Sequence, residues 1–321
     1  MENLRKIIIG IRNSKLSQAQ TDNFIKEASK IEDFTNSKTF EVKMITTAGD
    51  IHKEHRLDLL GGKGLFIKEI EDQLIAGQVD LGIHSLKDLP VTDVSKKLEI
   101  ICWLRRYDAS DALISNTNKK LFDLNPGSVI GTSSIRRRAQ ILNVRNDLKI
   151  KLLRGNVDTR IKKLRANEYD AIILSVAGLQ RLNLEDQITE VLAHEYFLPA
   201  ACQGAVGVQA SFESVFKNKL RPINHKATQT ECLAEREILK MINANCNSPI
   251  SVYAKINGDK ISISCELFEH NGKKLFSNSI EGEKDQSIKL SQSLGNEILI
   301  SVGKEKINQL DRLENDFNYA P

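Results

Sequence analysis

VIGTSSIRRR, residues 129–138, joins a short apolar run to three consecutive arginines through a Gly-Thr-Ser-Ser segment. The apolar residues are typical of a buried strand, and Ser133 or Ser134 is a suitable N-cap for a helix that contains the arginines. A strand followed directly by a helix is the repeating unit of an α/β layer fold. The start of such a helix offers unpaired N–H groups and the positive end of the helix dipole, both of which suit an anion.

The same alternation of strand and helix occurs on both sides of this stretch. Before it, strand patterns occupy residues 6–10, 40–47, 79–85 and 98–106, and helical patterns occupy 14–31 and 61–77. After it, strand patterns continue through KIKLLRG and YDAIILSVAG, with helical patterns at 134–145 and 156–166. This repetition predicts two α/β domains.

The pattern changes near Ser248. Residues 251–282 alternate between apolar and polar side chains, and Asn257-Gly258 and Asn271-Gly272 are strong signals for hairpin turns. A helical pattern at about 286–306 follows. These features predict a smaller α+β domain with a three-stranded antiparallel sheet.

The overall composition favours a soluble globular protein. The chain has 321 residues, of which 40% are hydrophobic, 27% charged and 5% aromatic. No apolar run approaches the roughly 20 residues needed to span a bilayer, and no signal peptide is recognisable, so we expect a cytoplasmic protein without membrane association. The five cysteines are odd in number and form no C-x-x-C pair, which predicts reduced thiols and no metal site.

Positive charge is concentrated in one segment. Residues 131–165 contain eleven Lys and Arg against two Asp, a local balance of +9, which leaves −5 for the rest of a chain whose total is +4. Nucleic-acid binding would explain such a segment, but aromatic residues for base stacking are few and no RNA-binding module is recognisable. We therefore expect no nucleic-acid partner.

Arginines recur wherever a predicted strand of the second domain ends. Arg154 and Arg160 flank the turn after KIKLL, and Arg181 follows the strand in YDAIILS. Because strand ends in an open α/β sheet border the usual ligand crevice, and the planar guanidinium group binds carboxylate or phosphate through two hydrogen bonds, the repetition predicts a polyanionic ligand. A solvated basic face is the alternative for any single run of this kind.

HSLKDLP, residues 84–90, is a candidate for catalysis. Asp88 follows Lys87 at a predicted strand end, and Pro90 favours an extended backbone immediately before it. A carboxylate fixed near cations could accept a hydrogen bond from an N–H group and stabilise developing positive charge. A surface Lys-Asp pair is the alternative.

Eight segments, taken together, identify a family. They are RNS, GGKGLF, HSLKDLP, GTSSIRRR, LLRGNVDTR, VAGLQRL, ACQGAVG and NANCNSP. In this order and at these separations they closely resemble the porphobilinogen deaminases, also called hydroxymethylbilane synthases, from about Ile7 to Tyr253.

The resemblance implies the domain arrangement. Two domains similar to a type-II periplasmic binding protein would enclose a cleft, and a third would carry the cofactor loop. The expected boundaries are 1–103 with 203–222 for domain 1, 104–202 for domain 2, and 223–321 for domain 3.

The resemblance also implies a transferase of haem biosynthesis that is usually monomeric. Such an enzyme joins four porphobilinogen molecules head to tail on a covalent dipyrromethane cofactor, releases ammonia, and finally releases linear hydroxymethylbilane. Here the cofactor would be attached through a thioether to Cys246, and Asp88 would be the catalytic carboxylate. Further cofactor-binding residues would be Lys87, Thr132, Ser133, Ser134, Arg136, Arg137, Arg154 and Arg160. Substrate-binding residues would be Arg12, Ser14, Lys63, Arg181 and Gln203.

Some features depart from the family pattern. Cys202 stands where glycine is usual, Asn245 precedes the anchor cysteine where glycine is common, and Arg138 has no assigned role. A non-enzymatic solute-binding module for a polycarboxylate anion would also explain a two-lobed, arginine-rich cleft. It would not explain a third domain that presents a thiol.

Overall fold

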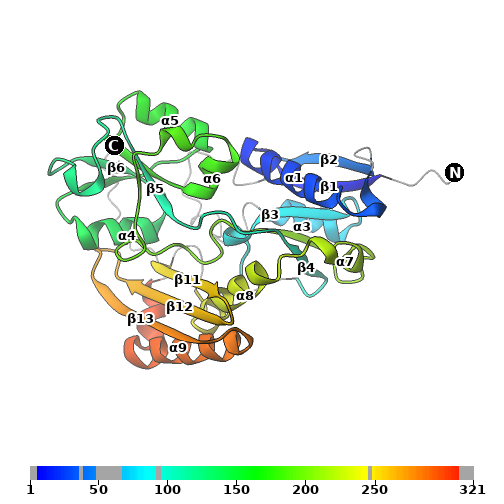
Figure 1. Cartoon of the computed structure of the whole chain (residues 1–321). Helices are drawn as coiled ribbons and strands as arrows, with labels where there is room; N and C mark the ends of the chain where they lie inside the picture. The colour runs from blue at the N-terminus through cyan, green and yellow to red at the C-terminus, as the bar shows by residue number, and fades with distance from the viewer. Residues whose placement is uncertain (1–5, 36–38, 48–66, 92–94, 245–247, 311–321) are drawn as a thin grey trace. The chain divides into compact units, whose positions relative to one another are not determined.

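The computed structural model describes residues 6–35, 39–47, 67–91, 95–244 and 248–310. The chain forms two compact units (Figure 1). The first comprises residues 1–107 and 205–229, and the second comprises 108–204 and 230–321. The chain therefore passes from the first unit to the second, returns for a short segment, and then re-enters the second.

The first unit contains a five-stranded sheet. Its order is β2 (Phe40–Ile45), β1 (Ile7–Arg12), β3 (Leu81–Ser85), β10 (Val206–Ser211) and β4 (Leu98–Trp103). The strand β1 is parallel to β2 and β3, whereas β10 is antiparallel to both β3 and β4. The returning segment thus supplies a strand inside the sheet.

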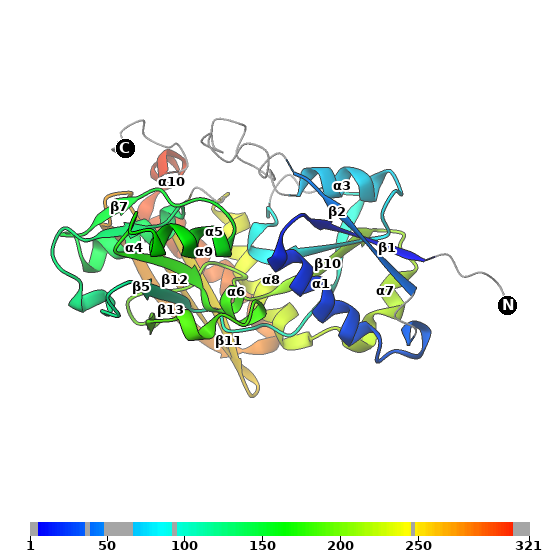
Figure 2. The same cartoon turned by 90° about the horizontal axis from the view of Figure 1, so that it is seen from above.

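Two helices cover opposite faces of this sheet, as the alternation of side chains along β1 requires. Ile9 packs in a cluster with Phe24 of α1 (Lys15–Ala28). Ile8 packs against a separate cluster that includes Ile70 of α3 (Lys68–Ile75). Figure 2 shows the two helices on either side of β1 and β2.

A second five-stranded sheet repeats this arrangement. Its order is β7 (Lys149–Lys151), β6 (Val129–Gly131), β8 (Ala171–Ser175), β5 (Asp111–Ser115) and β9 (Glu190–Val191). The strand β6 is parallel to β7 and β8, and β5 is antiparallel to β8 and β9. Helix α4 (Ile135–Val144) packs on one face, and α5 (Val157–Arg165) and α6 (Val176–Arg181) pack on the other.

The second unit also contains a three-stranded antiparallel sheet. Its strands are β11 (Ile250–Asn257), β12 (Lys260–Phe268) and β13 (Lys274–Glu283). Helices α8 (Lys226–Met241), α9 (Ser287–Val302) and α10 (Lys304–Leu310) contribute to its apolar core. The remaining elements are α7 (Phe216–Lys219), η1 (Glu32–Phe34), η4 (Leu86–Asp88), η5 (Leu121–Asp123), η6 (Glu185–Gln187), η7 (Arg221–Ile223) and η8 (Lys284–Gln286).

These three sheets confirm the predicted fold class of two α/β sheets and a smaller antiparallel sheet. The single helix expected at 286–306 is instead two helices, because Gly303 adopts a positive φ of 85° between α9 and α10. The helix expected at 61–77 is described only from residue 67 onward. In the described part of the chain, no helix has both the length and the apolar character needed to cross a bilayer.

Candidate functional site

The N-terminus of α4 has the capped form that the sequence predicts. Ser134 is the N-cap, and its Oγ accepts a hydrogen bond from the backbone N–H of Arg137. Thr132 is buried, and its Oγ1 accepts a bond from the Ser134 N–H. Ser133 is exposed between them. The helix therefore begins with hydroxyl groups arranged around its first N–H groups.

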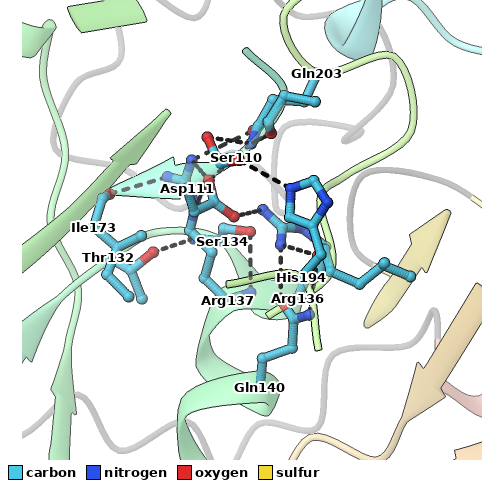
Figure 3. A network of polar contacts seen from close by, with 12 residues as sticks. Ser110, Asp111, Thr132, Ser134, Arg136, Arg137, Gln140, Ile173, His194 and Gln203 are labelled. Atoms are coloured by element: carbon cyan, nitrogen blue, oxygen red, sulfur yellow. Dashed lines mark hydrogen bonds and ion pairs between the residues drawn. The ribbon is translucent and has the colours of Figure 1, made fainter. Parts of the chain in front are cut away.

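A buried carboxylate lies between the first two arginines of α4 (Figure 3). Nη2 of Arg136 is 2.7 Å from Oδ2 of Asp111, and Nη2 of Arg137 is 2.6 Å from Oδ1. Nε of Arg137 donates to the same Oδ1 at 3.0 Å. Arg136 and Arg137 are only 5% and 6% exposed, and Asp111 is fully buried. The three charges form a compact internal triad with a formal charge of +1.

Neighbouring oxygens accept further hydrogen bonds from the two guanidinium groups. Nη1 of Arg136 donates to Oε1 of Gln140 at 2.7 Å and to the carbonyl of Leu198 at 2.9 Å. Nη1 of Arg137 donates to the carbonyl of Ile173 at 3.0 Å. These bonds hold both side chains in one orientation.

Gln203 connects this triad to the segment before β5. Its Nε2 donates to Oδ1 of Asp111 at 2.8 Å and to the carbonyl of Ala109 at 2.6 Å. The chain passes from one unit to the other after residue 107 and again after residue 204. Ala109 and Gln203 lie next to these two positions. Gln203 is 1% exposed. It thus ties together the points where the chain enters and leaves the second unit.

The charge of Asp111 is set by its two arginines. Burial on its own would raise the pKa of the Asp111 carboxyl, but the charges and hydrogen bonds of Arg136 and Arg137 outweigh burial and hold that pKa well below its usual range. The carboxylate is therefore ionised at neutral pH. It offsets one of two positive charges that would otherwise be buried together.

A serine–histidine contact borders the triad. Oγ of Ser110, the residue before Asp111, lies 2.9 Å from Nε2 of His194. The ring of His194 packs edge-on against Tyr253 of β11, with 4.7 Å between ring centroids. This contact links the end of the arginine network to the third sheet.

The other predicted arginines of the second unit lie in the segments that follow β7 and β8. Arg154 follows β7 and is partly buried. Nε of Arg160, in α5, donates to the carbonyl of Gly155 at 2.7 Å. Nη2 of Arg181, the last residue of α6, donates to the carbonyl of Gly204 at 2.7 Å.

The predicted residues of the first unit follow two adjacent parallel strands. Arg12 ends β1, and Ser14 is the N-cap of α1, where its Oγ accepts from the Ser17 N–H at 3.1 Å. Lys87 and Asp88 lie in η4, directly after β3, and both are exposed. Because β1 and β3 are parallel neighbours, these side chains follow the same edge of the sheet.

Two predicted residues, Cys246 and Lys63, lie outside the described residues.

Asp111 was missed by the sequence reasoning, although a signal existed. An acidic residue at the start of the apolar strand DALIS requires a cationic partner once that strand is buried. The sequence predicted that Arg136, Arg137 and Gln203 bind ligands. It did not predict the hydrogen bonds that all three side chains make with Asp111.

Comparison with known proteins decides the family. The model described as "Porphobilinogen deaminase, dipyromethane cofactor binding domain" matches residues 7–215, and the model of the porphobilinogen deaminase C-terminal domain matches residues 229–300. The chain belongs to the porphobilinogen deaminase family. The resemblance inferred from the eight segments is thereby confirmed.

Relatives cover nearly the whole chain. A porphobilinogen deaminase of Geobacillus kaustophilus is 40% identical over 89% of this chain and 92% of its own. One from Lysinibacillus sphaericus is 42% identical over 89% of this chain and 91% of its own. A solved periplasmic binding protein from Brucella ovis with glutathione bound has a TM-score of 0.41 at 13% identity, covering 74% of this chain and 69% of its own.

The donors of the second unit suit the cofactor named in the family description. A dipyrromethane carries carboxylate side chains, and guanidinium groups with hydroxyl groups at a helix N-terminus are suitable partners for carboxylates. Arg154 after β7, Arg181 at the end of α6 and Ser134 at the start of α4 are of these kinds. The net positive charge of the triad also favours an anion nearby.

Proposed function

We propose that this protein joins four porphobilinogen molecules head to tail on a covalently bound dipyrromethane. It releases one ammonia per addition and then linear hydroxymethylbilane, so it is a transferase of tetrapyrrole biosynthesis. Membership of the porphobilinogen deaminase family over nearly the full chain is the observation that carries this proposal.

The proposed cofactor site uses residues from the second unit and Lys87 from the first. Cys246 would hold the dipyrromethane through a thioether, and the bound group would supply the pyrrole carbon from which the chain grows. The residues that would bind its carboxylates are Lys87, Thr132, Ser133, Ser134, Arg136, Arg137, Arg154 and Arg160. Because Arg136 and Arg137 are already fixed by Asp111, they would act chiefly through the net charge of the triad.

The proposed substrate site draws on residues of both units. Arg12, Ser14, Lys63, Arg181 and Gln203 would bind the acetate and propionate groups of porphobilinogen. Every added ring brings two more carboxylates, so the demand for cationic partners rises as the product grows. The concentration of positive charge in residues 131–165 matches that demand.

Asp88 is the proposed catalytic residue. Its carboxylate would accept hydrogen bonds from pyrrole N–H groups and stabilise the positive charge that develops as ammonia departs. The exposed position of Asp88 after β3 supports this role because the carboxylate is accessible to a ligand. Lys87, the preceding residue, would bind a neighbouring carboxylate.

We propose that the protein is a cytoplasmic monomer that binds neither nucleic acid nor membrane.

A mass measurement tests the proposed enzymatic function. The purified protein, denatured and weighed intact, is expected to be heavier than its sequence by one dipyrromethane, and peptide mapping is expected to place the added mass on Cys246. An unmodified chain with full activity would exclude the mechanism. An unmodified chain that only binds polycarboxylates would favour a solute-binding module.

The role of Asp88 is tested by Asp88→Asn, which keeps the size of the side chain and removes its charge. Turnover is expected to fall at least about 100-fold, because the developing positive charge loses its carboxylate partner. The thermal midpoint should change little, since the side chain is exposed. Asp72→Asn, at an exposed position of α3 in the same unit, is the matched control and should keep normal turnover. Equal turnover in the two variants would remove Asp88 from the mechanism.

A further inference from the structure

Three potential metal ligands meet inside the second unit. The sulfur atoms of Cys202 and Cys232 and a carboxylate oxygen of Glu235 all lie within 4.8 Å of one another. Cys202 is 1% exposed, and the other two residues are fully buried. This cluster combines two soft sulfur donors with one carboxylate.

The fold brings these donors together from two segments. Cys232 and Glu235 are three residues apart on α8, so they project from the same face of the helix. Cys202 lies in the turn before β10, and its Sγ is 3.7 Å from the carbonyl oxygen of Cys232. Because the cysteines are 30 positions apart in the sequence, no local spacing reveals the cluster.

Backbone groups orient the carboxylate within the cluster. One oxygen of Glu235 accepts a hydrogen bond from the Cys202 N–H, and the other accepts from the Ala254 N–H of β11 at 2.8 Å. Metal-binding carboxylates commonly have such supporting hydrogen bonds, which fix the direction of the ligand. Glu235 therefore connects the turn, the helix and the third sheet at one point.

We propose that Cys202, Cys232 and Glu235 form a site for a thiophilic divalent cation of the Zn²⁺ class. Two thiolates and a carboxylate are ordinary ligands for such an ion, with metal–sulfur bonds of ~2.3 Å. Binding would bring the donors closer by rotation of the two cysteine side chains. One tetrahedral position would remain for water.

Charge balance permits an ion in this buried position. The two thiols each lose a proton when they bind the cation, so two positive charges enter as two protons leave. With one carboxylate, the cluster has a formal charge of −1 before and after binding. A buried site that gains no net charge avoids the desolvation cost that an unpaired ion would incur.

The proposed metal site lies close, along the sequence, to two positions where the chain passes between the units. Cys202 precedes the passage into the first unit after residue 204, and Cys232 follows the return after residue 229. A bound ion would connect these two places directly. It is therefore expected to raise the thermal midpoint of the protein, because it binds the folded form only.

The test uses the tag-free, reduced, purified protein titrated with Co²⁺, a spectroscopic substitute for Zn²⁺. We expect one Co²⁺ per chain, absorption from thiolate-to-cobalt charge transfer, and loss of that absorption when Zn²⁺ is added. Zn²⁺ should also raise the thermal midpoint.

Cys202→Gly is the decisive variant. Cys202 has a positive φ of 59°, which glycine adopts more readily than cysteine, so the variant should fold normally without metal. We expect its Co²⁺ affinity to fall at least about 100-fold, since even loss of a supporting residue costs 10–100-fold. Cys265→Ser, which changes a buried cysteine of β12 outside the cluster, should bind Co²⁺ like the unaltered protein.

Two results of this test would contradict the metal-site proposal. Absence of thiolate-to-cobalt absorption in the unaltered protein would overturn the proposal, as would equal Co²⁺ affinity in Cys202→Gly and Cys265→Ser. Neither result depends on turnover, so the proposed enzymatic function would be unaffected.

Discussion

Asp111 determines how two arginines of the family motif are held. Its carboxylate is fully buried and pairs with both Arg136 and Arg137. Removing one member of a buried charge network leaves the others without compensation, which costs more than the network itself contributes. Asp111 is therefore expected to be necessary for a stable second unit.

The variant Asp111→Asn tests this expectation. It should lower the free energy of unfolding by about 3–5 kcal/mol, because two buried guanidinium groups lose their only carboxylate within the triad. Urea unfolding measures the change. Asp147→Asn, which removes an exposed partner of Arg145, is the control and should have little effect. Similar losses in the two variants would show that burial of the triad is unimportant.

The buried imidazole of His84, on β3, should make the stability of the protein depend on pH. Burial lowers the pKa of His84 to about 4, although a hydrogen bond with Gln209 acts in the opposite direction. In the unfolded chain the pKa is about 6.5. As the pH falls below that value the unfolded form takes up a proton first, so stability present above pH 6.5 is lost progressively down to about pH 4.

The loss attributable to His84 should approach about 3 kcal/mol at pH 4. Urea unfolding at pH 7 and pH 4.5 measures it in the unaltered protein and in His84→Gln. The variant has no imidazole to titrate, so its stability should change less between the two pH values. An equal change in both proteins would assign the pH dependence to other groups.

At the residue scale, local sequence identified caps better than buried partners. Ser133 or Ser134 was expected as the N-cap of α4, and Ser134 is the N-cap, because this signal is confined to a few adjacent positions. The pairing of Asp111 with Arg136 joins residues 25 positions apart on different elements. Such a pair becomes visible only when the register of the sheet is known.

At the element scale, the two hairpin turns of the third sheet differ in their surroundings. Gly258 has a φ of +64° and nothing within 4 Å of the position where a Cβ would lie. Gly272 has a φ of +94°, and a Cβ there would lie 2.7 Å from the backbone of Leu142 and Asn143. The carbonyl of Gly272 also accepts a bond from Nδ2 of Asn143. The second turn is thus packed against α4.

Alanine substitutions should separate these two turns. Gly258→Ala is expected to cost about 1–2 kcal/mol from backbone strain alone. Gly272→Ala should cost about 1–3 kcal/mol more, because backbone atoms of α4 must also move. Thermal unfolding of both variants measures the difference. Equal midpoints would mean that the turn after β12 moves away from α4 at little cost.

Elements with strong local signals were predicted well. Both Asn-Gly turns lie between the expected strands, and α4 and α5 agree with their predicted ranges to within a residue or two. The strand β10 gave no comparable local signal, and the family resemblance implied only that residues 203–222 belong to domain 1. Its place between β3 and β4 depends on contacts with residues about 100 positions earlier in the chain.

At the scale of the whole molecule, neither unit is one continuous piece of chain. The first needs residues 205–229 to complete its sheet, since β10 separates β3 from β4. Periodicity predicted the number of α/β sheets but could not predict this exchange of segments. The three-domain boundaries inferred from the family remain a prediction beside the two compact units.

A fragment experiment tests the dependence of the first unit on its returning segment. Residues 1–107 alone should give poor amide dispersion in NMR spectra, because β4 has lost its partner in the sheet. The same fragment joined by a flexible linker to residues 205–229 should give dispersed resonances. A folded 1–107 fragment would show that β4 can be held without β10.

The late position of β10 also affects how the protein is made. Ribosomes add about 5–20 residues each second, so roughly 5–20 s separate synthesis of β4 from synthesis of β10. During that interval β3 and β4 have edges with no neighbour, and such edges can pair with other chains. Nascent molecules should therefore depend on chaperones most strongly in this interval, until the last strand of the first sheet leaves the ribosome.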